Sequence, residues 1–246
     1  MYAGVDWAGN GWFAVFLTED GSVEGHYYPT LWNLWRERND DITRMLVDIP
    51  IGLCEDKKRA CDVEAKRVLG GRHQSSVFYT PTRDAVCAEN IEAAKERQRE
   101  AEAGFGIQNQ AWSLVPRIRE VDAFVTDYDN CQKVFETHPE VCFDALNDGS
   151  LRHQKSDNRG IEERLNLLDE RCNIDVRGFY ETSRSTFREP TYAPIIGGKD
   201  DIIDALVAAV SAASTEGDLP SLPRRTEPDY DTTLNRKIEI KLPATE

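Results

Sequence analysis

The sequence has no long apolar run, no closely paired cysteines and no surplus of positive charge. No uncharged stretch approaches the roughly 20 residues that a helix needs to cross a bilayer, so a membrane-spanning protein is not expected. The chain does not begin with a basic and then apolar signal segment, and we therefore expect a cytoplasmic protein. The six cysteines form no C-x-x-C pair and have no histidine pair at zinc-binding spacing, which favours reduced, structural thiols.

Positive charge is scarce: 44 acidic residues stand against 30 basic ones, the net charge is -14, and arginine far outnumbers lysine. Such a surface opposes non-specific binding to phosphates, which argues against a nucleic-acid-binding protein with a broad basic patch. The acidic excess with few lysines resembles haloarchaeal proteins. In their high-salt cytoplasm the Debye length falls to roughly 3 Å at 1 M, so surface repulsion is screened.

The 246 residues, 40% of them hydrophobic, are enough to form one large globular domain with a substantial core. We expect this domain over residues 1–217, with a helical insertion at about 54–129. From 218 to 246 the composition turns polar, which predicts a C-terminal tail. Lys237 to Leu242 alternates in this tail like one edge strand that docks on the body.

The first residues predict three antiparallel strands with one acid at the first turn. The strands are Tyr2 to Val5, Trp12 to Leu17 and Ser22 to Tyr28, and Gly9 to Gly11 supplies the first turn. Asp6 follows the first strand directly. An ionised carboxylate costs several kcal/mol to bury without a partner, so we interpret Asp6 as a ligand of a divalent metal.

A second strand is predicted over Met45 to Ile49, where an uncharged run again leads to an acid, Asp48. A short helix over Leu31 to Arg38 precedes this strand. Two buried strands joined through a helix are most simply parallel neighbours, so Asp6 and Asp48 are expected at the same carboxyl edge of the sheet. Ligand sites of open α/β sheets collect at that edge.

The middle of the chain is predicted to be mostly helical. Helices are expected over Lys57 to Leu69, Ala85 to Ala103 and Asn109 to Asp127, with a loop from Gly70 to Pro81. This loop offers Arg72, Ser75 and Ser76 beside two glycines, groups that can hold a phosphate or a polar substrate. The alternative, which the residue types alone favour, is a structural loop whose hydroxyls cap the next element.

Further acids follow the strand predicted at Lys133 to Thr137. Glu136 lies near its end, and Glu140 opens a helical stretch, where a carboxylate also suits the helix dipole. Either glutamate can be a ligand. Lys155, which precedes an amphipathic helix, is either a phosphate-neutralising residue or an ordinary surface lysine.

The last predicted helix begins near Asp200 and carries Asp201 and Asp204 on one face. The first-turn carboxylates are ordinarily explained by the helix dipole. Asp204 is harder to explain in this way, because it lies one turn in and directly precedes an uncharged, buried stretch. A partner such as a metal ion is needed there.

This order of motifs resembles the DUF429 family of predicted ribonuclease H-like nucleases. The resemblance rests on Gly4 to Trp12, Val47 to Leu53, Arg72 to Pro81, Gln110 to Trp112, Glu136 to Phe143 and Asp200 to Ala209. The last motif also resembles the closing helix of RuvC-like resolvases, where two aspartates three residues apart precede Ala-Leu. The fold implied is a mixed α/β ribonuclease H-like sheet, with three antiparallel strands followed by parallel strands, flanked by helices.

The resemblance implies a nuclease that hydrolyses phosphodiester bonds of nucleic acid with two Mg²⁺ or Mn²⁺ ions. The catalytic and metal-binding residues implied are Asp6, Asp48, Asp201 and Asp204, with Glu140 or Glu136 as a further acid. The substrate-binding residues implied are Arg72, Ser75, Ser76 and Lys155. Two alternatives stay open, namely a non-catalytic binding or scaffold protein that retains the fold, and a Mg²⁺-nucleotide phosphotransferase or ATPase of related architecture.

Overall fold

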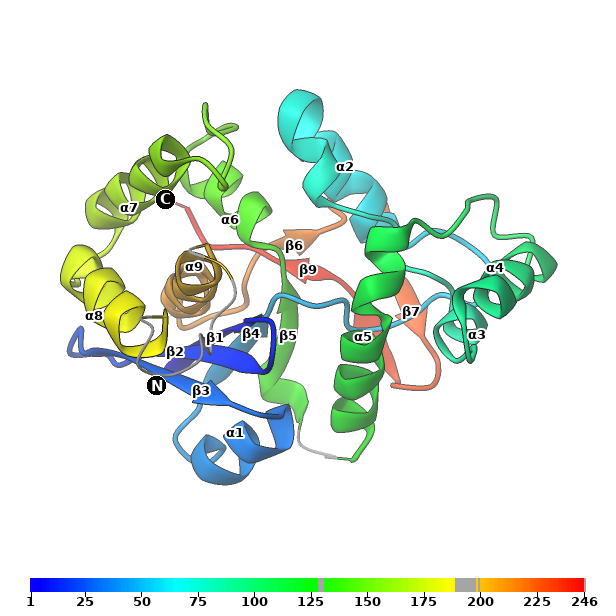
Figure 1. Ribbon diagram of the computed structural model, residues 1–246, viewed down its shortest axis with the longest axis horizontal. Helices are drawn as coiled ribbons and strands as arrows, with labels where there is room; N and C mark the ends of the chain where they lie inside the picture. Colours follow the sequence, from blue (N-terminus) through cyan, green and yellow to red (C-terminus); the bar gives the residue numbers. More distant parts are fainter. Residues whose placement is uncertain (128–130, 189–197, 199, 246) are drawn as a thin grey trace. The chain divides into compact units, whose positions relative to one another are not determined.

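The computed structural model describes residues 1–127, 131–188, 198 and 200–245 (Figure 1). The chain forms two compact units. The first unit contains Met1–Asp48, Gln132–Pro220 and Lys241–Glu246. The second contains Ile49–Cys131 and Ser221–Ile240. The sequence predicts one domain over 1–217 with a helical insertion at about 54–129, and the second unit includes this middle stretch of the chain.

A mixed sheet forms the centre of the first unit. Its strands are β1 (Tyr2–Trp7), β2 (Trp12–Leu17), β3 (Val23–Tyr28), β4 (Arg44–Val47) and β5 (Val134–Thr137), in the spatial order β3-β2-β1-β4-β5. The pairs β3-β2 and β2-β1 are antiparallel, whereas β1-β4 and β4-β5 are parallel. This arrangement confirms the predicted α/β class, with three antiparallel strands followed by parallel strands.

The C-terminal part of the chain contains two very short strands. They are β9 (Ile240–Lys241) and β6 (Ser221–Leu222). The boundaries between the units fall at these strands, between residues 220 and 221 and between residues 240 and 241. Beside that boundary, the backbone N–H of Leu242 donates to the carbonyl of Pro220 at 2.8 Å.

Helices cover the sheet of the first unit. They are α1 (Leu31–Arg38), α6 (Pro139–Leu146), α7 (Asn158–Arg171), α8 (Val176–Arg188) and α9 (Asp201–Ala213), with a 3₁₀ turn η2 (Cys131–Lys133) before β5. Figure 1 shows α9 against one face of the strands and α1 on the opposite side, next to β3. Among the described residues, no helix is both long and apolar enough to cross a membrane.

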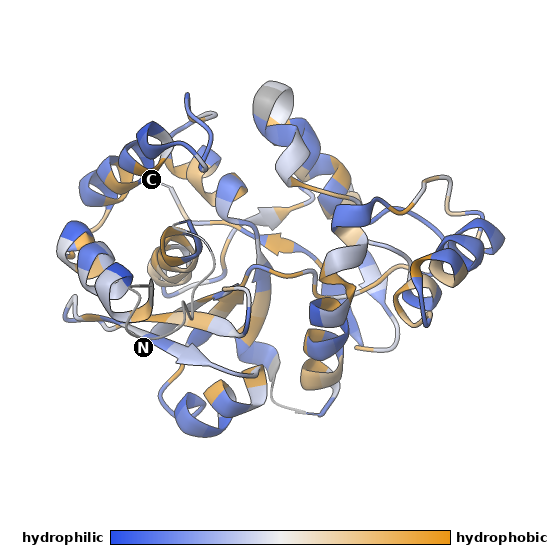
Figure 2. Ribbon diagram, in the orientation of Figure 1, coloured by the Kyte–Doolittle hydropathy of each residue, from blue (hydrophilic) through white to orange (hydrophobic). Residues whose placement is uncertain are grey.

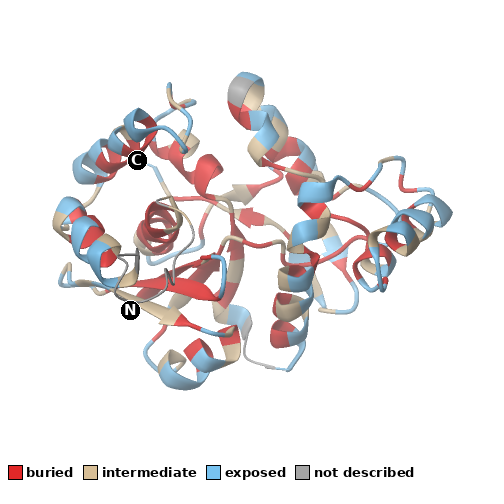
Figure 3. Ribbon diagram, viewed as in Figure 1, coloured by how far each residue is buried: buried red, intermediate tan, exposed pale blue. Residues whose placement is uncertain are grey.

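The contact between α9 and β1 organises this core. An added Cβ at Gly4 of β1 would overlap the backbone of Ala205 and Ala209 in α9, so the strand and the helix touch through their main chains. The small side chains of α9 permit this approach. The helix α9 is apolar and buried along nearly its whole length, whereas α7 and α8 bury only one side (Figures 2 and 3).

The second unit is largely helical, as the sequence predicts. Its helices are α2 (Ala60–His73), the 3₁₀ turn η1 (Gln74–Ser76), α3 (Arg83–Val86), α4 (Ile91–Glu100) and α5 (Asn109–Asp127). The backbone leaves helical geometry at Gly70 and Gly71, with φ of 47° and 34°, which is where the sequence predicts a loop to begin. The single helix predicted over Ala85 to Ala103 is wrong. A new helix starts after Asn90, whose side chain accepts a hydrogen bond from the N–H of Ala93.

The segment predicted as a polar tail contains several short strands. Besides β6 and β9 it contains the antiparallel pair β7 (Asp229–Asp231) and β8 (Arg236–Ile238). Two aspartates of β7 tie this pair to the rest of the second unit. Asp231 accepts the N–H of Leu53 at 2.7 Å, and Asp229 accepts the N–H of Ala60 at 2.6 Å. These bonds join positions more than 160 residues apart, so local sequence patterns do not reveal them.

Candidate functional site

Asp6 lies at the carboxyl end of the central strand β1. The β strand covers Tyr2–Trp7, and the Asp6 side chain is 7% exposed. Its Oδ1 accepts a hydrogen bond from the N–H of Trp7 at 2.8 Å, which fixes the orientation of the carboxylate. The antiparallel neighbour at this position is Phe13 of β2, so an apolar strand flanks the acid on one side.

Asp48 lies beside Asp6 because their strands are parallel and in register. Val5 of β1 pairs with Val47 of β4, so each aspartate is the residue that follows a paired valine. The N–H of Asp48 donates to the carbonyl of Val5 at 2.9 Å, which continues the ladder to the edge of the sheet. The expectation that both acids share one carboxyl edge is confirmed.

The helix α9 brings two further aspartates from the other end of the chain. Asp201 and Asp204 are in its first turn, and Asp204 is 1% exposed. The close packing of α9 on β1 sets the position of both. The Asp201 Oδ2 accepts the N–H of Gly198 at 2.7 Å. We call the set of four acids the aspartate cluster, and its members are Asp6, Asp48, Asp201 and Asp204.

The acids of the cluster act on one another electrostatically. Burial, followed by the charge of Asp48, raises the pKa of Asp6 well above its usual range. The charges of Asp204 and Asp201 raise the Asp6 pKa further. Burial raises the pKa of Asp48 to about 7, and burial likewise raises that of Asp204 to about 7. Without a cation, the folded chain therefore holds these carboxylates at a cost.

Lys155 is the cation that partly offsets this cost. Its Nζ lies 2.6 Å from Asp204 Oδ2 and 3.1 Å from Asp200 Oδ2. Asp204, then Asp200 and Asp6, raise the pKa of Lys155 above its ordinary value, against the opposing effect of burial. The Lys155 charge also lowers the pKa of Asp48. Lys155, predicted as a phosphate ligand or a surface lysine, has a side chain that is 39% exposed and is the counter-ion of Asp204 and Asp200.

Glu140 has a counter-ion of its own. The Nη2 of Arg164 lies 2.7 and 2.8 Å from its two carboxylate oxygens, and both side chains are almost completely buried. The charge of Glu140 also contributes to the raised pKa of Asp48, which places this glutamate near the cluster. Glu136 is buried on β5, where it pairs in register with Val47.

Arg164 is a site residue that the sequence analysis missed. It lies on α7 between Ile161 and Leu165, on the face that packs into the core. A charged residue at the i+3 position of an apolar helix face must find a partner when it is buried. That pattern was the available signal, because Ile161, Leu165 and Leu168 alone define the buried face.

The predicted residues of the Gly70 to Pro81 region belong to the second unit. Ser75 is exposed, and the Ser76 hydroxyl donates to the carbonyl of His73 at 2.7 Å. For Ser76 this is a local structural role of the kind that the residue types favour. The side chain of Arg72 lies outside the part of the chain that the structure describes.

The donor atoms of the aspartate cluster fit a hard divalent cation. They are carboxylate oxygens, and Asp204 Oδ1 is buried without a hydrogen-bond partner among the described residues. In the arrangement of the structure, no three His, Cys, Asp or Glu side chains in the described ranges are placed as a metal site. Lys155 is bound to one oxygen of Asp204 and to Asp200, so a metal that binds Asp204 would compete with this ammonium.

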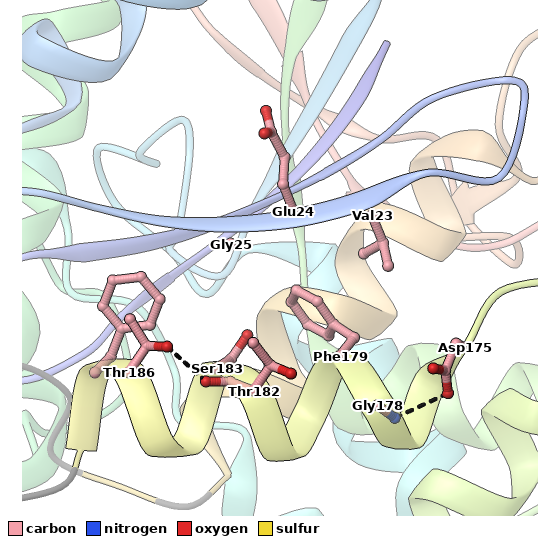
Figure 4. A pocket seen from close by; sticks show the side chains of 10 residues that line it. Val23, Glu24, Gly25, Asp175, Gly178, Phe179, Thr182, Ser183 and Thr186 are labelled. Atoms are coloured by element: carbon pink, nitrogen blue, oxygen red, sulfur yellow. Dashed lines mark hydrogen bonds between the residues drawn. The ribbon is translucent and has the colours of Figure 1, made fainter.

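A second hollow in the first unit is separate from these acids. It lies between β3 and α8 and has a volume of about 440 Å³ (Figure 4). Its lining includes the apolar residues Val23 and Phe179 and the polar residues Thr182 and Ser183. None of its lining residues belongs to the aspartate cluster, so this hollow is not part of the candidate site.

A family model described as "Protein of unknown function (DUF429)" matches residues 4–228. This match covers most of the chain. The protein belongs to the DUF429 family. The predicted family is thereby confirmed, and the match adds no activity, because the family is described as having unknown function. Comparisons with curated proteins and with solved structures gave no match.

Proposed function

We propose that this DUF429 protein is a metal-dependent nuclease that hydrolyses phosphodiester bonds of nucleic acid. The observation that carries the proposal is the aspartate cluster. Two parallel strands and one helix, from opposite ends of the sequence, bring four carboxylates within electrostatic range of one another. Burying like charges raises the free energy of the folded state, so such a cluster is best explained by the cation that it binds.

The cluster has the oxygen ligands that Mg²⁺ and Mn²⁺ prefer, and Asp6, Asp48 and Asp204 would hold the metal, with Asp201 beside them. A bound pair of such ions supplies an activated water and stabilises the leaving oxygen of a phosphodiester. Asp6 is central to the set, because its pKa is raised by each of the other three acids. Its backbone-anchored carboxylate is therefore the residue whose loss should affect metal binding most.

Lys155 gives the site two ionic arrangements. In the arrangement described here its ammonium neutralises Asp204 and Asp200. It therefore competes with a divalent cation for the oxygens of Asp204. Once it is released from Asp204, Lys155 is positioned at the same site to neutralise a substrate phosphate, which is the role that the sequence resemblance implies.

The sheet order supports the same proposal. Three antiparallel strands followed by two parallel strands are the arrangement expected from the ribonuclease H-like resemblance. The pair Asp201 and Asp204, followed by Ala205, matches the RuvC-like closing helix position by position. Both points concern the fold and the motif, and the reaction itself remains our proposal.

The test is cleavage of a panel of single-stranded, duplex, hybrid and branched nucleic acids, with Mn²⁺ or Mg²⁺, at low salt and at molar KCl. We expect cleavage by the wild type, no cleavage by Asp6→Asn, and wild-type cleavage by Asp218→Asn, an exposed control in the same unit. Cleavage that Asp6→Asn leaves unchanged would refute the proposal. Calorimetric titration with Mn²⁺ should show uptake by the wild type and by Asp218→Asn, and loss of that uptake in Asp6→Asn.

A non-catalytic binding protein is the second candidate. The observation that favours it is the internal compensation of the site, since Lys155 neutralises Asp204 and Arg164 neutralises Glu140 without any metal. This alternative predicts no carboxylate-dependent Mn²⁺ uptake in the titration. A third outcome, nucleotide turnover without nucleic-acid cleavage, would favour the phosphotransferase that the fold resemblance also allows.

A further inference from the structure

The second unit contains an open cavity, and none of the described residues that line it is acidic. Its volume is about 530 Å³, and it is lined by Lys66, Gln74, Ser75, Gln108, Asn109 and Gln110. Three segments contribute to it, namely α2, η1 and the beginning of α5. The first turn of α5 also has no acidic residue. In a chain with a net charge of -14, a cavity with one lysine and several amides is an exception that points to an anionic or polar ligand.

Lys66 is held in place by the walls of this cavity. Its Nζ donates to the carbonyl of Gln74 at 2.9 Å and to the carbonyl of Val77. An ammonium group has three donors, so one remains for a ligand. Both bonds restrict the flexible side chain, and a ligand that binds Lys66 therefore loses little additional side-chain entropy.

A second lysine, Lys58, lies near the same aromatic ring as Lys66, that of Tyr79. The Nζ atoms of Lys58 and Lys66 are 4.2 and 5.3 Å from the centroid of the Tyr79 ring. Tyr79 packs edge-to-face with Phe105 at a centroid distance of 5.7 Å, and Lys58 is also 5.6 Å from the Phe105 ring. Both rings are partly exposed. Two cations thus lie beside two aromatic rings, and one of them, Lys66, also lines the polar cavity.

We propose that this surface, formed by Lys58, Lys66, Tyr79, Phe105 and the polar cavity, binds a single strand of nucleic acid. Grooves for single strands combine cations that contact phosphates with aromatic rings that contact unstacked bases. The amides of Gln74, Gln108 and Gln110 add groups that can hydrogen-bond to base edges. Stacked bases inside a duplex are not accessible to such rings, which favours a single strand over a duplex. The inference rests on the proposed nuclease function and names the class of its substrate.

The experiment measures binding of the full-length chain to fluorescently labelled oligonucleotides by anisotropy, in EDTA, over a range of salt concentrations. The probes are a single-stranded DNA, the RNA of the same sequence and the corresponding duplexes. The variants are Lys58→Ala, whose side chain makes no hydrogen bond within the described ranges, and Phe105→Leu, which keeps an apolar side chain but removes the ring. Lys95→Ala, on an exposed position of α4, is the matched control.

We expect the wild type and Lys95→Ala to bind single strands more tightly than duplexes. Lys58→Ala should lower the slope of log affinity against log salt by roughly 0.7, the value for one phosphate contact on a single strand. Phe105→Leu should weaken binding by roughly fivefold or more, the effect of one lost contact between a base and a ring. Equal affinity of all variants, or preferential duplex binding, would overturn the inference. The inference would also be overturned if inorganic phosphate displaced the labelled oligonucleotide as well as an unlabelled oligonucleotide does, because that result would indicate a site for a small phosphate.

This outcome is separable from the nuclease proposal. If binding depends on Lys58 but no metal supports cleavage, the nuclease proposal fails and the binding surface stands. If cleavage depends on Asp6 but Lys58→Ala and Phe105→Leu leave affinity and KM unchanged, the binding surface is refuted and the nuclease proposal stands.

Discussion

Replacing Asp48 by asparagine should stabilise the first unit at neutral and alkaline pH when no divalent metal is present. Lys155 pairs with Asp200 and Asp204, and no salt bridge of Asp48 is seen among the described residues, so the change removes a charge without breaking one. Burial raises the pKa of Asp48 to about 7 from an ordinary value of 3.8. The charge of Lys155 lowers this pKa, and the charges of Glu140 and Asp201 raise it. An amide of the same shape avoids the cost of ionising this carboxyl.

The sign of the pH dependence follows from proton linkage. Between about pH 4 and pH 7 the folded chain retains a proton that the unfolded chain has released, so the free energy of unfolding falls as pH rises. Above the folded pKa the curve becomes level. A pKa that is higher by about three in the folded chain corresponds to roughly 4 kcal/mol of unfolding free energy. Asp48 is partly exposed and the neighbouring acids share its proton, so we expect Asp48→Asn to raise the free energy of unfolding by only about 2 kcal/mol at pH 8.

Urea unfolding in EDTA, followed by tryptophan fluorescence, measures this effect. Four of the five tryptophans, including the fully buried Trp12, lie in the first unit, so the signal mainly reports its unfolding. The wild type and Asp218→Asn should lose stability from pH 5 to pH 8, and Asp48→Asn should lose less. A wild-type stability that is level or rises between pH 4 and pH 7 would contradict the electrostatic account of the cluster.

Four further predictions test the site and its support. Saturating Mn²⁺, at about 100 times its Kd, should stabilise the wild type by about 2.7 kcal/mol, more at pH 8 than at pH 5, and should not stabilise Asp6→Asn. Arg164→Met leaves Glu140 buried without its cation and should cost about 3–5 kcal/mol in urea unfolding, with partial recovery when Glu140→Gln is added. Gly4→Ala should cost at least about 3 kcal/mol because its Cβ overlaps the α9 backbone, whereas Gly217→Ala should be nearly neutral. If the acidic surface is an adaptation to high salt, thermal unfolding should move upward as KCl rises towards 1 M, and a protein most stable at low ionic strength would refute that origin.

The aspartate cluster could be predicted from the sequence because its acids stand beside uncharged, apolar runs. Asp6 and Asp48 each follow a short uncharged run, and parallel pairing places the ends of two such runs at one edge. Asp204 lies in the first turn of α9, an apolar helix that has almost no exposed side to receive a charge. In each case the cost of burying a carboxylate identifies the residue, and the rules of sheet topology bring the acids together.

The counter-ions Arg164 and Lys155 were harder to predict from the sequence, for two different reasons. Arg164 shows a pattern, since it lies within the apolar face of α7, but its partner Glu140 is 24 residues away. Lys155 lies in a loop before α7, where no periodicity indicates burial, and its pairing with Asp204 depends on how α9 packs against the sheet. A sequence can show that a buried charge needs a partner without showing which residue supplies it.

The ordered C-terminal segment shows the same limit at the level of the fold. Strands of two or three residues carry too little alternation to be detected, and a polar composition there is typical of a tail. What orders them is a pair of carboxylates, Asp229 and Asp231, that accept backbone N–H groups of Ala60 and Leu53 in the same unit. Both acids look like ordinary surface residues until their distant donors are known.

The difference between these acids and the aspartate cluster is the strongest argument for a cation-dependent function. Asp229 and Asp231 are satisfied by backbone donors and by Lys57 and Arg83, so their burial needs no further partner. Asp204, by contrast, keeps one buried oxygen without a partner among the described residues, although Lys155 already binds the other. A carboxylate that serves only the fold would be expected to have both oxygens bonded. The incomplete bonding of Asp204, next to Asp6 and Asp48 with their raised pKa values, is what a site that exchanges Lys155 for a divalent cation requires.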